Sequence, residues 1–300
     1  MRFTAGSHTD IGTRKTVNQD AYGLRVVESG LCELAFAVVC DGVGGMSEGE
    51  VASGVVVCSF LEWFEGHMAQ LFLDGLSEDE VLKQWDQTAQ RANACIFAYG
   101  KEKQEHIGTT ATVFLAVYDR VFFMNIGDTR LYRADQEGLH LLSKDHTLVQ
   151  QEVEQGMLTP EEARADKRKN ILTRCLGAEA RAVPDFYSDR FCPGSLWLLC
   201  TDGFRNRLEE NELYRGVSPE RVRRGEDISE LLRRLTQTVK ERGERDNITA
   251  AAIYMDETAD SLEQTVDLED TVNLRCVRER IQPEAIQLWR DSCSDDRRAL

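Results

Sequence analysis

The sequence predicts one large domain that mixes β-strands with helices, followed by a shorter C-terminal appendage. The chain has 300 residues, of which 42% are hydrophobic, and mixed domains of about 250 residues often form a single unit. Short apolar runs of strand length recur, and two of them lead into an Asp-Gly pair. Helix-capping patterns lie between these runs and indicate helices.

The N-terminal part predicts a buried strand followed by two helices. Residues 34–40 are continuously apolar and lead into Asp41 and the glycine-rich turn Gly42-Val43-Gly44-Gly45. Apolar residues then recur at helical spacing over residues 52–69. Ser77-Glu78-Asp79-Glu80 has the capping-box pattern and predicts a second helix that runs to Gly100.

The middle of the chain predicts a hairpin and a further strand. Residues 111–118 and 121–126 are apolar and rich in β-formers, with Asp119-Arg120 as the turn between them. The second run leads into Gly127-Asp128-Thr129-Arg130 and then into a short strand at 131–133. A second carboxylate is therefore expected at a strand end.

A polar helical segment and another strand follow. Residues 147–177 are polar, with Gly156 as a C-cap and Thr159-Pro160-Glu161-Glu162 as a capping box with proline at the first helical position. Residues 195–200 predict a strand that ends in Thr201-Asp202-Gly203. This repeats the strand and Asp-Gly arrangement found at Asp41.

The last predicted strand, residues 248–254, directly follows Asp246-Asn247. Before it, Asp227 or Ser229 can cap a helix that continues through Val239. Residues 256–300 begin acidic, then become mixed and amphipathic, and lack strand signals. We expect this segment to be a linker with a short helix, outside a domain formed by residues 1–255.

Composition excludes several classes of function. The 52 acidic and 36 basic residues give a formal net charge of -16, which disfavours nucleic acid or an anionic membrane as the main partner. No stretch of about 18 uncharged apolar residues and no secretory leader is present, so we expect a cytoplasmic protein. Nine cysteines without a CxxC pair indicate buried, reduced thiols.

Five aspartates share similar surroundings, four at strand ends and one in Asn18-Gln19-Asp20. They are Asp20, Asp41, Asp128, Asp202 and Asp246. If they converge in space, their mutual repulsion requires cations. Oxygen ligands without accompanying His or Cys select hard ions such as Mg²⁺ or Mn²⁺. One Asp-Gly pair alone would more simply mark a turn, but five aspartates in similar contexts favour a metal centre.

At these residues the sequence resembles the metal-dependent protein phosphatases of type 2C, the PPM family, particularly its bacterial members. The resemblance runs in order over residues 3–255, and eight short motifs in the correct order make it specific. The motifs are Asp10-Ile11-Gly12 with Asn18-Gln19-Asp20-Ala21, Asp41-Gly42-Val43-Gly44-Gly45, Gly108-Thr109-Thr110, Gly127-Asp128-Thr129-Arg130, Lys144-Asp145-His146-Thr147, Leu172-Thr173-Arg174, Thr201-Asp202-Gly203 and Asp246-Asn247.

The resemblance implies an α+β fold, a four-layer α-β-β-α sandwich of two antiparallel sheets flanked by helices, with the metal ions at one end. It implies that Asp41 bridges two core ions. Asp202 and Asp246 would bind one of these ions, and Asp20 and the Gly42 carbonyl would bind the other.

The implied activity is hydrolysis of phosphoserine and phosphothreonine in proteins, reversing a cytosolic kinase. Two divalent ions about 4 Å apart lower the pKa of a shared water and present hydroxide to the phosphorus atom, so no protein nucleophile is required. Asp128, with Asp202, matches the positions that hold a third, weaker ion in bacterial relatives.

Two positions depart from the family pattern. Many relatives carry a phosphate-binding arginine five residues before the position of Asp20, where this chain has Lys15, preceded by Arg14. We expect Lys15 to bind the substrate phosphate, with Arg14 as a substitute, unless both are solvated loop charges. Val43 replaces a proton-donating histidine of some eukaryotic relatives, so a metal-bound water would supply that proton. These departures motivate one alternative, a catalytically weak or idle phosphoprotein-binding module.

Three further features have less specific interpretations. His146 is expected to orient its segment rather than to act in catalysis. Lys167-Arg168-Lys169 could attract acidic phosphopeptides or form an exposed helical face. Thr265-Val266-Asp267-Leu268 and Thr271-Val272-Asn273-Leu274 could dock a phosphothreonine-binding domain, or could belong to an acidic disordered linker.

Overall fold

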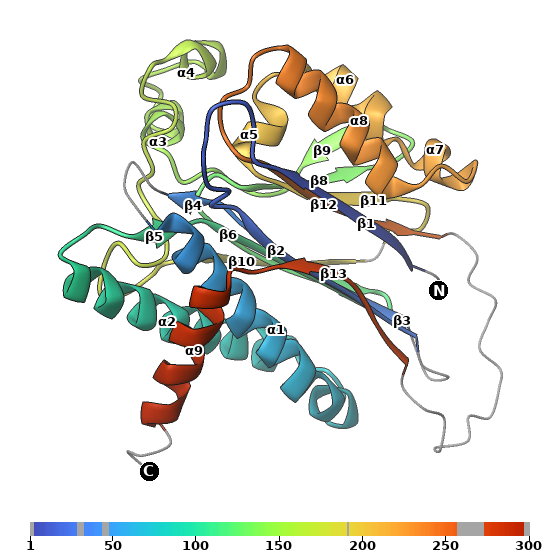
Figure 1. Ribbon diagram of the computed structural model, residues 1–300. Helices are drawn as coiled ribbons and strands as arrows, with labels where there is room; N and C mark the ends of the chain where they lie inside the picture. Colours follow the sequence, from blue (N-terminus) through green and yellow to red (C-terminus); the bar gives the residue numbers. More distant parts are fainter. Residues whose placement is uncertain (1–2, 29–32, 44–47, 191, 257–272, 297–300) are drawn as a thin grey trace.

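Two antiparallel β-sheets stack face to face at the centre of the molecule (Figure 1). The computed structural model describes residues 3–28, 33–43, 48–190, 192–256 and 273–296. In spatial order, the first sheet consists of β1 (Phe3–Asp10), β12 (Ile248–Met255), β11 (Leu196–Cys200), β8 (Arg130–Ala134) and β9 (Leu139–Leu141). The second sheet consists of β10 (Asp185–Arg190), β7 (Arg120–Ile126), β6 (Ala111–Val117), β3 (Glu33–Cys40), β2 (Ala21–Glu28) and β13 (Asn273–Arg280).

Helices cover both outer faces of this sandwich (Figure 1). The second sheet is covered by α1 (Gly49–Leu73), α2 (Glu78–Lys103) and α9 (Pro283–Asp296). The first sheet is covered by α5 (Asp202–Arg205), α6 (Glu210–Val217), α7 (Pro219–Arg223) and α8 (Ile228–Glu241). At one end lie α3 (Leu148–Glu154), α4 (Pro160–Ala165) and a short ladder of β4 (Gly42–Val43) and β5 (Gly108–Thr109). The predicted four-layer α+β sandwich is confirmed.

Three apolar layers hold these elements together, one between the sheets and one under each set of helices. Strand β3 contributes to two of them. Phe36 and Val38 pack under α1 and α2, whereas Ala37 and Val39 pack between the sheets. Successive side chains point to opposite faces of a strand, so burial of both faces explains the uninterrupted apolar run at residues 34–40.

The start of α2 differs from its prediction. Ser77 is the N-cap residue, but its side chain makes no capping hydrogen bond. Glu80 does not complete the predicted capping box, because its carboxylate accepts hydrogen bonds from Lys83 and Gln84 instead. The capping box at Thr159 is confirmed by both of its hydrogen bonds.

The hairpin turn lies one residue earlier than predicted. Val117 pairs with Arg120, so Tyr118 and Asp119 form the turn, and Tyr118 has a positive φ of 51°. Arg120 belongs to β7, where its guanidinium lies 4.7 Å from the centre of the Phe122 ring. The backbone pairing of Arg120 with Val117 therefore places it in the strand.

The C-terminal segment contains a strand that the sequence interpretation missed. Strand β13 pairs antiparallel with β2, and its register shifts between Cys276 and Arg278. This irregularity interrupts the alternation of apolar and polar residues that would have indicated a strand. Residues 257–272, which contain the first threonine motif of the tail, lie outside the described residues.

None of the described helices is both long and apolar enough to span a membrane. Cys40 and Cys200 are free, buried thiols, as predicted. The prediction of buried thiols is wrong for five other described cysteines, which are only partly buried: Cys58, Cys95, Cys175, Cys192 and Cys293.

Candidate metal centre

Three of the predicted aspartates follow or precede strands of the second sheet at one end of the sandwich. Asp20 precedes β2 and Asp41 follows β3, and the register pairs Ala21 with Cys40. Asp128 follows β7 two residues after its end. The antiparallel register therefore places the two loops that carry Asp20 and Asp41 side by side.

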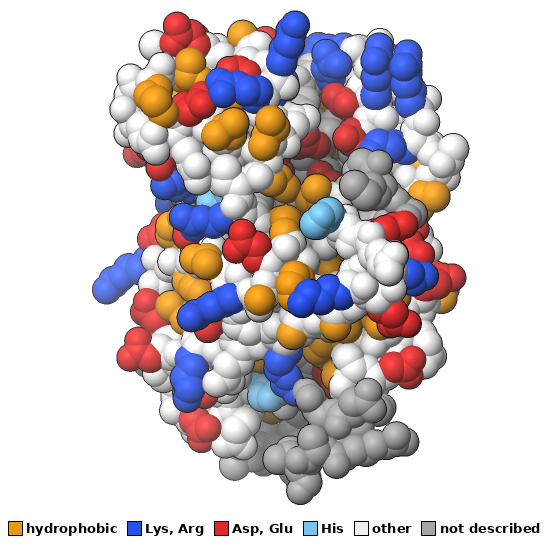
Figure 2. Space-filling model, turned by 90° about the vertical axis from the view of Figure 1, so that its left-hand side faces the viewer, with side chains coloured by type: hydrophobic (Ala, Val, Ile, Leu, Met, Phe, Trp, Pro, Cys, Tyr) orange, Lys and Arg blue, Asp and Glu red, His pale blue; other side chains and the backbone are white. Residues whose placement is uncertain are grey.

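The other two aspartates come from the first sheet. Asp202 begins α5 directly after β11, and Asp246 lies just before β12. Cys200 pairs with Ala250, so these two loops also share one end. Figure 2 looks onto this end of the molecule and shows acidic side chains gathered in a hollow, with basic side chains nearby.

Asp41 is fixed through its backbone and lies within the field of the other four aspartates. Its N–H donates to Thr110 Oγ1 at 3.0 Å, and its carbonyl accepts from Thr110 N and Thr109 Oγ1, both at 2.9 Å. Burial raises the pKa of Asp41 well above its usual value. The charges of the other four predicted aspartates raise it further.

Asp20 is 3% exposed and carries one oxygen without a partner. Its Oδ2 accepts a hydrogen bond from Thr201 Oγ1 at 3.1 Å, whereas Oδ1 is buried and has no hydrogen-bond partner among the residues that the structure describes. Burial is the main cause that raises the pKa of Asp20 to about 7, and the charges of Asp202 and Asp246 add to it.

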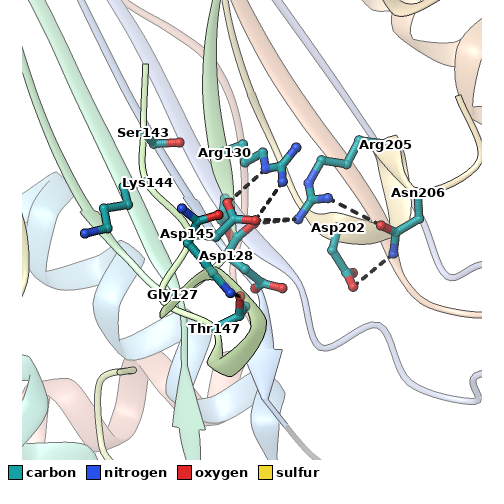
Figure 3. Close-up of polar contacts among 12 residues, drawn as sticks. Gly127, Asp128, Arg130, Ser143, Lys144, Asp145, Thr147, Asp202, Arg205 and Asn206 are labelled. Atoms are coloured by element: carbon teal, nitrogen blue, oxygen red, sulfur yellow. Dashed lines mark hydrogen bonds and ion pairs between the residues drawn. The ribbon is translucent and has the colours of Figure 1, made fainter. Parts of the chain in front are cut away.

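Asp128 and Asp202 lie against a pair of residues on α5 (Figure 3). Asn206 Nδ2 donates to Asp202 Oδ2 at 3.1 Å, and an Arg205 nitrogen donates to the Asp128 carbonyl at 3.0 Å. Burial raises the pKa of Asp128 to about 7, with a further contribution from Asp202, although Arg205 opposes both. Burial also raises the pKa of Asp202.

Lys15 lies at the edge of the cluster, whereas Arg14 does not reach it. The Lys15 ammonium is 3.0 Å from Asp246 Oδ1. Burial opposes the charged form of Lys15, but its hydrogen bond to Asp246 and the charges of Asp41 and Asp20 raise its pKa overall. Arg14 is exposed and forms no hydrogen bond or ion pair with the described residues.

Two glycines allow the loops of the cluster to approach one another closely. A Cβ on Gly42 would lie 2.4 Å from the Gly49 carbonyl oxygen and 2.6 Å from that of Gln19. A Cβ on Gly203 would lie 2.1 Å from the carbonyl oxygen of Asn247. Larger residues at these positions would push apart the backbone segments that carry the aspartates.

His146 is buried and hydrogen-bonded on both sides. The Gly127 N–H donates to its Nδ1 at 3.1 Å, so the proton is on Nε2, which donates to Asp185 Oδ2 at 3.0 Å. Burial lowers the pKa of His146 overall, although Asp185 opposes this shift. His146 and Arg174 line a polar cavity of about 300 Å³ beside α3. These contacts support an orienting role for His146.

The basic cluster of residues 167–169 is partly neutralised. The Arg168 guanidinium lies 2.7 Å from Glu152 and 2.8 Å from Asp166. This pairing favours an exposed, solvated surface for Arg168 over a phosphopeptide site. The predicted helical face is wrong, because α4 ends at Ala165 and residues 167–170 form a turn.

The donor set of the cluster fits hard divalent cations. Its carboxylates are held close enough to raise one another's pKa, and the buried Asp20 Oδ1 lacks a hydrogen bond. An unpaired buried carboxylate oxygen is costly unless a cation binds it. Cys40 offers no soft ligand here, because its buried side chain packs in the apolar layer under α1 and α2.

The comparison with known protein families agrees with this chemistry. The family described as protein phosphatase 2C matches residues 9–251. The chain belongs to this family.

Relatives of this protein phosphatase 2C chain are bacterial serine/threonine phosphatases. It is 29% identical over 251 residues to protein phosphatase PhpP of Streptococcus pneumoniae, a match that covers 83% of this chain and 96% of the relative. The crystal structure of serine/threonine phosphatase Stp1 from Staphylococcus aureus superposes with a TM-score of 0.74 at 26% identity, covering 85% of this chain and 96% of the other. The catalytic domain of PstP in complex with 2 manganese ions has the same fold, with a TM-score of 0.67, 24% identity, and coverage of 84% and 97%.

The protein phosphatase 2C site includes polar residues that the sequence interpretation did not single out. Arg205 and Asn206 follow Asp202 at helical spacing, a signal that could have placed all three on one helix. Arg130 pairs with Asp145 through two nitrogens, at 2.9 and 2.7 Å, and both residues lie within family motifs. Their roles required the structure, since nothing in their spacing shows that they meet.

Proposed function

We propose that this protein phosphatase 2C chain hydrolyses phosphoserine and phosphothreonine in proteins with two Mn²⁺ or Mg²⁺ ions, and holds a third, weaker ion. The observation that carries this proposal is the group of five aspartates, of which Asp20, Asp128 and Asp202 are buried, together with an Asp20 oxygen that has no hydrogen-bond partner among the described residues. The residues that would hold the ions are Asp20, Asp41, Gly42 through its carbonyl, Asp128, Asp202 and Asp246.

Within this group, Asp41 lies among the other four carboxylates and would bridge the two core ions. Asp202 and Asp246 would hold one ion, and Asp20 with the Gly42 carbonyl would hold the other. When bound, the ions lower the pKa of a water molecule and neutralise charge on the transferring phosphoryl group.

Lys15 would bind the substrate phosphate. Its ammonium lies beside Asp246 and within the field of Asp41 and Asp20, and a lysine binds phosphate as a point charge. Arg14, the substitute suggested by the sequence, is exposed and lies away from the described contacts of the cluster.

Neither Val43 nor His146 would supply the proton for the leaving alkoxide. Val43 cannot donate a proton. His146 is buried, and its Nε2 proton is directed at Asp185. The side chain of His146 therefore serves to hold the Asp128 loop, through the hydrogen bond from Gly127.

The substrates would be proteins phosphorylated by a serine/threonine kinase in the cytoplasm. The net charge of -16 supports a protein rather than a nucleic-acid or membrane partner. Docking of a phosphothreonine-binding domain on the tail rests on the sequence motifs alone.

The test is hydrolysis of a phosphothreonine peptide with Mn²⁺, with EDTA, and by the Asp41→Ala and Asp202→Ala variants. We expect turnover that requires the metal and is lost in both variants. Asp119→Ala is the matched control, because Asp119 is an exposed turn residue at the opposite end of β7 from Asp128. Turnover that persists after chelation would refute the metal mechanism, and a folded, metal-loaded protein without turnover would favour the idle binding module.

A further inference from the structure

The C-terminal strap, defined here as β13 and α9 (residues 273–296), lies beyond the part of the chain that matches the protein phosphatase 2C family. The family match ends at residue 251. The strap returns to the phosphatase body, where β13 pairs with β2 and α9 packs against α1 and α2 (Figure 1). It therefore adds a layer of contacts beyond the matched part of the chain.

Two polar contacts anchor the strap. Arg25 on β2 is 5% exposed, and its guanidinium lies 3.1 Å from Glu65 of α1 and 2.5 Å from Glu279 of β13. Trp289 of α9 donates from its indole nitrogen to Glu62 Oε2 of α1 at 2.6 Å. Both anchors join the strap to the same helix, α1.

The strap also contacts α1 near the N-terminal end of that helix. Ala285 is fully buried, and a Cβ placed on Gly54 would lie 2.4 Å from the Ala285 Cβ and 3.3 Å from Ile281 Cγ2. A side chain at residue 54 therefore cannot be accommodated without moving α9 or α1. The two helices are in direct contact at this point.

The neighbouring residues of α1 contact the loops of the metal centre. Ser53 Oγ donates to the Gln19 carbonyl at 2.6 Å, and the same carbonyl accepts from Gly42 N at 3.2 Å. Gln19 directly precedes Asp20, and the Gly49 carbonyl closes over Gly42. A shift of the first turns of α1 would therefore move the backbone of Gly42 and the loop that carries Asp20.

We propose that the C-terminal strap positions the metal centre, because α9 contacts α1 at Gly54 and α1 contacts Gly42 and Gln19. Gly54 and Ala285 are the positioning residues, and they act through Ser53 and Gly49. The inference rests on the proposed function, in which Asp20 and the Gly42 carbonyl share an ion. It assigns to residues outside the family match a role in metal affinity.

The test measures Mn²⁺ binding to the full-length protein by titration calorimetry, without substrate. Gly54→Ala should raise the Kd for Mn²⁺ roughly tenfold, as is typical when residues that support metal ligands are changed. The double variant Gly54→Ala/Ala285→Gly removes the clashing Cβ and should restore most of the affinity. Gly66→Ala is the control on the same helix, since a Cβ there meets nothing within 4 Å, and its Kd should equal that of the wild type.

A second variant, Trp289→Ala, loosens the strap without inserting an atom and should also raise the Kd, by several-fold. Unchanged affinity in Gly54→Ala and Trp289→Ala, alongside lowered melting temperatures, would overturn the inference and leave the strap a purely stabilising element. The proposed function fails separately, if the wild-type protein itself does not bind Mn²⁺ or if Asp41→Ala binds it equally well.

Discussion

Two groups of aspartates near the same end of the sandwich have pKa values that shift in opposite directions, although burial raises the pKa in both. Asp128, in the cluster, is 6% exposed, and its pKa is raised to about 7. The side chain of Asp145 is 11% exposed, yet its pKa is lowered, because Arg130 and Arg205 outweigh the effect of burial. Asp128 and Asp145 are thus similarly buried, and they differ in the positive charge that arginines of the protein place beside them.

The comparison shows which carboxylates require a cation from outside. Asp145 and Asp185 receive theirs from arginines of the chain, Arg130 and Arg174 respectively. Asp20 and Asp41 have no arginine partner among the described ion pairs. The arginines beside the cluster bind the surrounding groups, so the central oxygens stay available to metal ions.

The largest effect is expected when the centre of the cluster is removed. Asp41→Ala should lower kcat/KM by at least about 10³-fold, since loss of electrostatic stabilisation at a single group already costs about 10²–10³. Steady-state hydrolysis of a phosphothreonine peptide would measure this. The folded state should survive, because removal of one carboxylate relieves repulsion, and a variant that fails to fold would contradict that reasoning.

Asp145→Asn should affect stability more strongly than any substitution within the cluster. It leaves Arg130 largely buried without its counter-charge, which costs on the order of 3 kcal/mol of the free energy of unfolding. Urea denaturation would report the change. Asp166→Asn, which removes one partner of the exposed Arg168, serves as the control and should change stability little; equal effects would show that burial of the arginine is unimportant.

The metal-free protein should lose stability as the pH rises from about 4 to about 7. Over this range, folded Asp20 and Asp128 retain protons that the unfolded chain releases near 3.8. Asp145, whose pKa is lowered, contributes stability that is lost only as the pH falls below that value. Melting temperatures in EDTA across this range would measure the effect.

The Asp128→Asn variant is the control for this pH dependence. Because it removes one titrating group, the melting temperature in EDTA should fall less steeply with rising pH. Added Mn²⁺ should raise the melting temperature more at about pH 8 than at about pH 5, since metal ligands must be deprotonated. A melting temperature in EDTA that rises steadily to neutral pH would contradict the assignment.

Asp128→Ala should have a more moderate effect on turnover. We expect kcat to fall about tenfold, in line with the loss of a residue that supports metal binding. Stability of the metal-free protein should be unchanged or increased, since repulsion with Asp202 is relieved. A destabilised variant would make Asp128 a structural residue.

The smallest effect on the kinetic constants is expected when Lys15 or Arg14 is replaced. Lys15→Ala is expected to raise KM several-fold with little change in metal affinity, because its ammonium lies at the edge of the cluster. Arg14→Ala should leave both constants unchanged. Kinetics of the two variants side by side would decide between them, and equal KM values would leave both residues as solvated loop charges.

The sequence predicted the elements whose signals are local. The apolar run before Asp41 and the capping box at Thr159 were both found as expected. Strand β13 was missed because its bulge disturbs the alternation. The turn was misplaced by one residue because the apolar run continues through Tyr118, which the pairing of Val117 with Arg120 places in the turn.

The convergence of the aspartates could be predicted only as a hypothesis, since it depends on strand register. The pairing of Ala21 with Cys40 brings two of their loops together. The supporting contacts of Arg205 and Asn206 depend on how α5 lies over the sheet. Such contacts depend on tertiary packing, and the spacing of residues along the sequence indicates them only weakly.

The pairing of β1 with β12 joins residues 3–10 to residues 248–255. During synthesis, β1 therefore lacks its partner strand, β12, until almost all of the region that matches the family has left the ribosome. Contacts of such long sequence separation slow folding. Asp20 and Asp246, from opposite ends of that region, come together only after this closure, so a nascent or truncated chain cannot assemble the metal centre and should remain inactive.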